Sequence, residues 1–137
     1  MTKVLVFGVF DNLHEGHKFF IQEAKKLGDH LTVVITPDEV VKSFKNKTPE
    51  FDLKDRIKHL KKIDQIDEVI VGDSRIGQWS IFKNFTPDII AIGHDQDALE
   101  TAARKYFEKS ETKPRFIRIE GFKTDIYKTS LIQKQNG

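Results

Sequence analysis

The fold is decided by residues 3–17, which read KVLVFGVFDNLHEGH. Residues 3–9 are mainly apolar, which is typical of a buried parallel strand. Gly8 and Gly16 allow the backbone to approach a ligand closely. A helix that begins near Glu15 would point its free N–H groups and the positive end of its dipole at an anion. This stretch therefore predicts a strand-to-helix turn that binds phosphate.

Two histidines, His14 and His17, stand three positions apart at this turn. If both lie at the start of the helix, both can donate hydrogen bonds to phosphoryl oxygens. Their spacing alone leaves a pair of surface histidines in a polar loop as the alternative. The residues around them, from Gly8 to His17, favour the phosphate site.

Length and composition argue against several classes of protein, namely nucleic-acid-binding, disulfide-bonded and membrane-spanning ones. The chain has 137 residues, which is enough for one domain, residues 1–137, with a proper core. Lys and Arg number 23 against 21 Asp and Glu, so we expect no nucleic-acid partner. Cysteine is absent, which excludes disulfides and cysteine-ligated zinc. We find no signal peptide and no apolar run near the ~20 residues of a membrane span, so we expect a cytoplasmic protein without a membrane partner.

Strand-like and helical patterns alternate along the chain. Strands are expected at residues 3–9, 31–36, 68–71, 88–92 and 115–119. Helices are expected at residues 16–27, 52–63, 76–85, 97–110 and 129–135, with a short helical turn or loop at 37–39 and a lysine-rich connection at 42–51. Strands separated by helices predict an α/β fold, in which a five-stranded parallel sheet is doubly wound, with helices on both faces and ligands at the carboxyl ends of the strands.

Further candidate residues fall where strands end. Gly93 permits a tight turn after the fourth strand, and Asp95 then lies at the ligand edge of the sheet. The alternative makes Asp95 or Asp97 the N-cap of the next helix. Thr129 or Ser130 would cap the last helix, where a hydroxyl is also a second seat for phosphate.

Three basic residues have open roles. Lys45 and Lys47 belong to the lysine-rich connection, either as a solvated surface or as charges that close over a phosphate. Arg56 either braces the site or pairs with Asp52 or Asp55.

The residues from Gly8 to His17 resemble the signature of the cytidylyltransferase-like nucleotidyltransferases, which reads G-x-F-D-x-x-H-x-G-H. The resemblance implies a Rossmann-like fold and transfer of a nucleoside monophosphate from a nucleoside triphosphate to a phosphate-bearing acceptor, with release of pyrophosphate. Val9 replaces the family's small hydroxyl residue, which removes one side-chain contact to phosphate. The implied nucleotide-binding residues of this motif are Gly8, Val9, Phe10, Asp11, His14, Gly16 and His17.

Two later segments resemble the archaeal FAD synthetases of this superfamily. PDIIAIGHDQ (residues 87–96) is similar to a loop that lies against the base and ribose, which implies nucleotide contacts at Gly93 and Asp95. GFKTDIYKTS (residues 121–130) is similar to a run that precedes paired hydroxyls, and Asp125 stands where those enzymes often carry a cysteine. Aligned on the hydroxyls, Lys123 also takes the place of an arginine in the glycerol-3-phosphate cytidylyltransferases. The nucleotide contacts implied here are Phe122, Lys123, Thr129 and Ser130.

The resemblance also implies a mechanism that depends on position and charge. No general base is needed, because the acceptor phosphate is already ionised at neutral pH. We expect His14 and His17 to stabilise the α-phosphate and the departing oxygen, and Lys45 or Lys47 to complete the catalytic group. Mg²⁺ is expected to enter with the triphosphate, without a metal site built from protein ligands. Asp11 would orient His14, hold that ion through water, or serve as a turn residue.

The substrates follow from the closest resemblance. ATP and FMN are favoured, with FAD as the product. The alternatives are transfer from CTP to glycerol 3-phosphate, nucleotidyl transfer to a sugar phosphate of the lipopolysaccharide precursors, and a non-catalytic nucleotide sensor. A homodimer is a further expectation, because members of the superfamily are often dimers.

Overall fold

The computed structural model describes residues 1–45, 48–74, 78–83 and 85–120. Within these ranges a parallel sheet has the strand order β3-β2-β1-β4-β5. Its strands are β1 (Lys3–Gly8), β2 (His30–Ile35), β3 (Glu68–Val71), β4 (Ile89–Ile92) and β5 (Arg115–Arg118). The five-stranded parallel sheet expected from the sequence is confirmed, and each strand bound differs from its expected position by no more than one residue.

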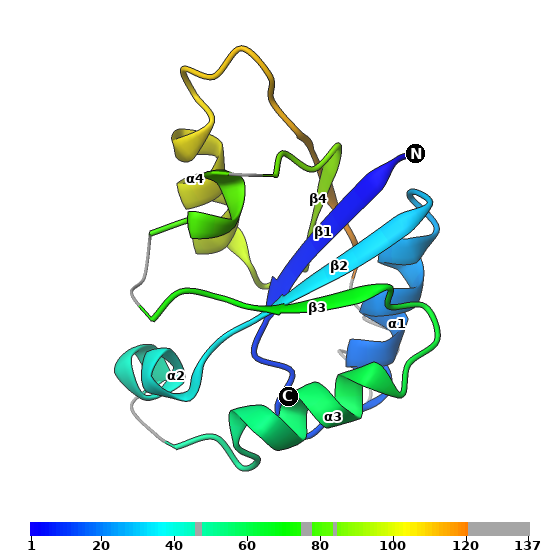
Figure 1. The fold of residues 1–137 in the computed structure, drawn as a ribbon, viewed down its shortest axis with the longest axis vertical. Coiled ribbons are helices and arrows are strands. Elements are labelled where there is room, and N and C mark those ends of the chain that lie inside the picture. The colour runs from blue at the N-terminus through cyan, green and yellow to red at the C-terminus, as the bar shows by residue number, and fades with distance from the viewer. Residues whose placement is uncertain (46–47, 75–77, 84, 121–137) are drawn as a thin grey trace, which may run out of the picture.

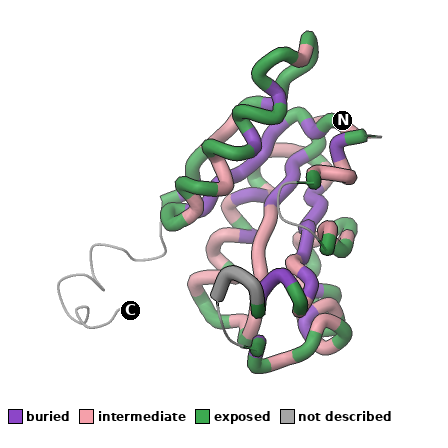
Figure 2. The backbone as a smooth tube through the Cα atoms, turned by 90° about the vertical axis from the view of Figure 1, so that its left-hand side faces the viewer, coloured by how far each residue is buried: buried purple, intermediate pink, exposed green. Residues whose placement is uncertain are grey.

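Helices cover both faces of this sheet, as expected (Figure 1). Alternate residues of β1 serve opposite faces, because side chains along a strand point to opposite sides. Val4 and Val6 belong to a buried cluster with residues of α1 (Glu15–Lys25) and α3 (Leu53–Lys61). Leu5 belongs to a second cluster, with Phe82 of the 3₁₀ helix η1 (Ser80–Lys83) and Phe107, which directly follows α4 (Asp97–Tyr106). Buried backbone follows the strands between these two layers (Figure 2).

The place where a ligand binds follows from the strand order. The chain leaves β1 toward β2 through α1, and it leaves β4 toward β5 through α4, in opposite directions across the sheet. β1 and β4 are hydrogen-bonded neighbours. The carboxyl ends of these two strands therefore border the crevice in which doubly wound sheets bind ligands.

The helices differ from the expected pattern more than the strands do. Residues 38–45 form a full helix, α2 (Asp38–Lys45), where the sequence indicated a short turn followed by a lysine-rich connection. Two acidic residues in its first turn complement the helix dipole, and Val40 and Val41 are buried, which stabilises the helix. Helix α3 begins with Asp52 as its N-cap, whose carboxylate accepts the Asp55 N–H at 2.9 Å.

The helix expected at residues 76–85 is wrong as an α-helix. The described residues of this range contain only the 3₁₀ turn η1, and Trp79 directly before it has φ of 54°, which an α-helix does not permit. Helix α4 ends at Tyr106 and not at residue 110, and Phe107 after it is buried against Phe82. The helix expected at 129–135 lies outside the described residues. No helix in the described ranges is long and apolar enough to cross a membrane.

Candidate active site

The turn after β1 has an unusual backbone. Phe10 and Asn12 both have φ of 52°, a region in which residues with a Cβ are uncommon. Phe10 is buried and its ring folds back over Gly8, where an added Cβ would lie 2.6 Å from the ring. Gly8 is therefore required by close packing, and the turn delivers the chain to the start of α1.

His14 and His17 cap this helix together. His14 is the N-cap residue, and its Nδ1 accepts the N–H of Gly16 at 3.0 Å. The N–H of His14 in turn donates to Nδ1 of His17 at 3.3 Å. An added Cβ at Gly16 would lie 2.9 Å from Cε1 of His14, so only glycine fits beneath this ring. Gly16 serves the site by its lack of a side chain, because its N–H is already used by His14.

These two bonds fix the chemistry of both imidazoles. A neutral ring that accepts at Nδ1 carries its proton on Nε2, so each histidine has an Nε2–H donor. The two rings stack with centroids 3.9 Å apart and planes inclined by 26°, and the Phe10 ring meets His17 edge-on at 5.6 Å. Two N–H donors at the positive end of a helix can bind an oxyanion.

The loop after β4 lies at the same edge of the sheet. The side chain of Gln96 accepts the N–H of Gly93 at 2.8 Å and donates to the carbonyl of Phe7 at 2.9 Å. Gln96 thus ties the end of β4 to the end of β1, a role that the sequence analysis missed. Gln96 is also the N-cap of α4, without a side-chain cap bond, so the alternative that made Asp95 or Asp97 the N-cap is wrong. Asp95 is exposed at this edge.

Arg118 at the end of β5 is a second residue that the sequence analysis missed. Its Nη1 donates to the carbonyls of Gly93 and His94 at 3.1 and 3.2 Å. Its Nη2 pairs with Glu100 at 2.5 Å and with Asp97 at 2.8 Å. The hydrogen bond with Glu100 raises the pKa of Arg118 above its ordinary value. Arg118 therefore fixes the loop that carries Asp95.

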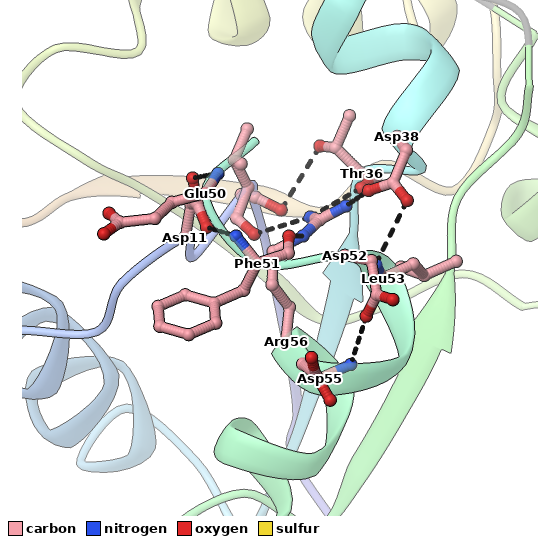
Figure 3. A network of polar contacts seen from close by, with 11 residues as sticks. Asp11, Thr36, Asp38, Glu50, Phe51, Asp52, Leu53, Asp55 and Arg56 are labelled. Atoms are coloured by element: carbon pink, nitrogen blue, oxygen red, sulfur yellow. Dashed lines mark hydrogen bonds and ion pairs between the residues drawn. The ribbon is translucent and has the colours of Figure 1, made fainter. Parts of the chain in front are cut away.

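Arg56 is the most deeply placed charged residue near the turn, with no exposed surface (Figure 3). Its guanidinium forms an ion pair with Asp38 of α2. Pairing with Asp52 or Asp55, which was the alternative from the sequence, is wrong, because the guanidinium points away from them toward the strand ends. Nη1 of Arg56 donates to the carbonyl of Val9, which enters the network through its backbone.

Asp11 lies beside this group. Its two carboxylate oxygens accept the N–H groups of Glu50 and Phe51 at 2.6 and 2.8 Å. The bond that holds the His14 ring comes from Gly16 and not from Asp11. The described residues contain no group of three His, Cys, Asp or Glu side chains that could hold a metal ion.

The remaining candidates are placed only in part. Lys45 is the last residue of α2. Five candidates lie outside the described residues: Lys47, Phe122, Lys123, Thr129 and Ser130.

The fold and the histidine pair define a class of protein, the nucleotidyltransferases with a Rossmann-like sheet and histidines at the first helix. A model of the cytidylyltransferase-like family matches residues 5–135, so the chain belongs to this family. The family expected from the sequence is thereby confirmed, and the chain is a nucleotidyltransferase.

Two FAD synthases and one crystal structure are similar to this chain over most of its length. The FAD synthase of Thermococcus sibiricus is 38% identical over 134 residues, which cover 96% of this chain and 90% of that protein. The FAD synthase of Thermococcus kodakarensis is 40% identical over 135 residues, or 95% of this chain and 88% of that protein. A crystal structure of a protein described as the lipopolysaccharide core biosynthesis protein of Thermoplasma volcanium is similar with a TM-score of 0.80 and 32% identity, covering 89% of this chain and 98% of that one.

Proposed function

We propose that this chain transfers the adenylyl group of ATP to FMN and produces FAD and pyrophosphate. The stacked pair of His14 and His17, with two Nε2–H donors at a helix N-terminus, is the observation that supports the reaction type. Similarity to FAD synthases over about nine-tenths of their length supports the choice of substrates.

The proposed step is a direct displacement at the α-phosphorus of ATP. An oxygen of the FMN phosphate forms a bond to this phosphorus, while the bond from the phosphorus to the oxygen of the departing pyrophosphate breaks. No side chain has to remove a proton, because the attacking phosphate is ionised at neutral pH. His14 and His17 donate from Nε2 to the α-phosphate and to the departing oxygen, where negative charge increases in the transition state.

Other residues enter this proposal from the resemblance. Lys45 or Lys47, together with Lys123, would neutralise the β- and γ-phosphates. Thr129 and Ser130 would donate hydrogen bonds to the same phosphates. Lys45 is the last residue of α2, whose first residue, Asp38, follows the carboxyl end of β2.

The base and ribose of the nucleotide would lie against the loop after β4. Gly93 and Asp95 belong to this loop, and Gln96 and Arg118 fix its backbone. Phe122 is proposed as a neighbouring contact by resemblance. This assignment agrees with the rule that ligands bind where doubly wound sheets reverse direction.

Mg²⁺ is proposed to arrive on the triphosphate. Both carboxylate oxygens of Asp11 accept backbone N–H groups, and the described residues offer no cage of protein ligands. This set fits an ion held mainly by phosphate oxygens and water. When bound, the ion neutralises phosphate charge.

A second candidate function is transfer to a sugar phosphate. The similar crystal structure that is described as a lipopolysaccharide core biosynthesis protein favours it. Both functions use the same phosphate seat, so the acceptor distinguishes them.

The deciding experiment measures pyrophosphate release and the nucleotide product for ATP or CTP with each of three acceptors: FMN, glycerol 3-phosphate and a sugar 1-phosphate. FAD formation from ATP and FMN alone would support the proposal. CDP-glycerol or a nucleotide sugar would replace it with the corresponding alternative. ATP binding without product in any pairing would indicate a nucleotide sensor. The variant His17→Ala is the control, and we expect its turnover to fall by about 100-fold or more.

The expected homodimer is tested separately, by sedimentation velocity with and without ATP. A single species of monomer mass in both conditions would contradict it. The cytoplasmic location stays a prediction from the sequence.

A further inference from the structure

The turn between β1 and α1 needs outside support to keep its shape. Phe10 and Asn12 hold φ of 52°, and backbone of this kind persists only where the surrounding structure over-determines it. The histidine seat begins directly after this turn, at His14. Whatever fixes the turn therefore also fixes the two imidazoles.

Arg56 holds the first half of the turn. Its buried Nη1 donates to the carbonyl of Val9 at 2.9 Å and to the carbonyl of Thr36 at 2.8 Å. Its Nε donates to the carbonyl of Phe51 at 3.1 Å, and Asp38 supplies the counter-charge. One planar group thus ties the backbone after β1 to the backbone after β2 and to the segment before α3 (Figure 3).

Asp11 holds the second half of the turn. Its carboxylate accepts the N–H groups of Glu50 and Phe51 at 2.6 and 2.8 Å. Phe51 therefore gives its carbonyl to Arg56 and its N–H to Asp11. Residues 50–51 are bonded directly to Asp11 and, through Arg56, to the carbonyl of Val9. These contacts hold the turn on both sides of Phe10, as a clamp with two arms.

From this geometry, and resting on the proposed function, we propose that Arg56 is a positioning residue for the transfer reaction. Together with Asp11 it sets the backbone from which His14 and His17 act. Arg56 works through the Val9 carbonyl and not by contact with substrate. Lysine cannot replace it, because a single ammonium group on a flexible stem cannot reproduce the planar fork that reaches three carbonyls and a carboxylate.

The test uses Arg56→Lys and Asp11→Asn, which weaken one arm each while keeping similar size. Each variant of the full chain is assayed for kcat and KM with ATP and FMN, well below its own melting temperature. We expect kcat to fall by about tenfold or more, with KM for ATP changing by less than about threefold, because the misplaced donors act mainly in the transition state. The amide resonance of Gly16 and the ring ¹⁵N resonances of His14 should shift in both variants.

Arg115→Lys is the matched control, because Arg115 is exposed at the amino end of β5, at the opposite edge of the sheet. It should leave kcat and these resonances at the wild-type values. If folded Arg56→Lys and Asp11→Asn keep kcat within about threefold and keep the Gly16 and His14 resonances, the positioning role is wrong and the arginine only stabilises the fold.

The same variants separate this proposal from the proposed function. If the wild-type chain makes no FAD, the proposed substrates are wrong. The positioning role of the clamp is then tested by the Gly16 and His14 resonances and by their response to MgATP. Unchanged resonances in both variants would overturn the clamp, whereas displaced resonances would support it without any turnover.

Discussion

Replacing the N-cap of α1 separates the stability of the helix from the chemistry of the site. We consider His14→Asp and His14→Asn, which both put a side-chain oxygen where Nδ1 of His14 now accepts the Gly16 N–H. Asp and Asn are among the best N-cap residues, whereas histidine is not. Neither carries an imidazole, so both remove one of the two Nε2–H donors.

The effect on stability is small and favourable for Asp. A better cap adds about 0.5 kcal/mol, part of the usual range for capping. A negative charge at the helix N-terminus adds about 0.5 kcal/mol. Loss of the ring stack on His17 removes about 0.5 kcal/mol, the low end of the range, because His14 is exposed and His17 is only half-buried. We expect the free energy of unfolding of His14→Asp to rise by about 0.5 kcal/mol, and that of His14→Asn to stay within about 0.5 kcal/mol of wild type.

The effect on turnover is large and opposite in sign. Loss of one oxyanion donor costs about 100- to 1000-fold in kcat, which we expect for His14→Asn. The carboxylate of His14→Asp also repels the α-phosphate, by between ~1 kcal/mol in water and ~4 kcal/mol near a protein surface at 4 Å. A further loss of at least about fivefold should therefore separate the two variants.

Urea denaturation at pH 7 and pyrophosphate release with ATP and FMN measure the two effects on the same preparations. Asn is the control for Asp, because it differs only in charge. The reasoning would be refuted if His14→Asp unfolded more easily than wild type by 1 kcal/mol or so, or if either variant kept turnover within about tenfold.

Two further predictions concern the packing around the site, and a third concerns an ion pair at the amino edge of the sheet. Gly16→Ala should lower turnover by about 10- to 100-fold, because the new methyl displaces the His14 ring, while helix propensity offsets the loss of stability to within about 1 kcal/mol. Gln96→Ala should lower the free energy of unfolding by about 1–3 kcal/mol and raise KM for ATP, because two backbone groups lose their partner. Asp67→Asn should destabilise the chain at pH 7, because a hydrogen bond from Lys25 holds the pKa of Asp67 below its ordinary value of 3.8. This stabilisation is present above pH 3.8 and is lost as the pH falls through the lower pKa of the folded state, so the difference in melting temperature should vanish in strong acid.

Each of these has an outcome that would contradict it. Gly72→Ala is the control for Gly16→Ala, because its new methyl would meet nothing closer than 3.3 Å, and equal losses of turnover in both would remove the steric argument. An unchanged KM for ATP in folded Gln96→Ala would show that the loop after β4 does not contribute to nucleotide binding. A stability difference between wild type and Asp67→Asn that stays constant down to strong acid would show that the ion pair is not its cause.

The sheet and the placement of both histidines at the first helix could be predicted because their signals are local. Apolar runs mark β1 and β4, and the spacing of His14, Gly16 and His17 within four residues places them on one helical turn. The reciprocal capping bonds were not foreseen, because histidine is not an ordinary N-cap residue. Which ring nitrogen accepts is decided by how each imidazole is oriented toward a backbone N–H, and residue type alone does not give that orientation.

The misses arise from contacts between residues far apart in the chain. Gln96 reaches Phe7 across 89 positions, and Arg118 reaches Gly93 across 25. Arg56 was expected to pair with nearby Asp52 or Asp55, but its partner Asp38 lies 18 positions away. A buried arginine also contradicts the usual exposure of charged residues, and the convergence of three carbonyls, two after strands and one before α3, explains it.

The starts of α1 and α3 show how function changes a helix cap. Helix α3 uses Asp52, a strong cap, whereas α1 uses His14, a weaker cap that accepts the Gly16 N–H at Nδ1 and leaves Nε2 as the donor of the proposed reaction. The weaker cap leaves the turn before it dependent on Arg56 and Asp11, which lie away from the reacting atoms. Stability and activity are therefore opposed at the capping residue itself. At the clamp they change in the same direction, because there a single set of bonds supports both the fold and the position of the donors.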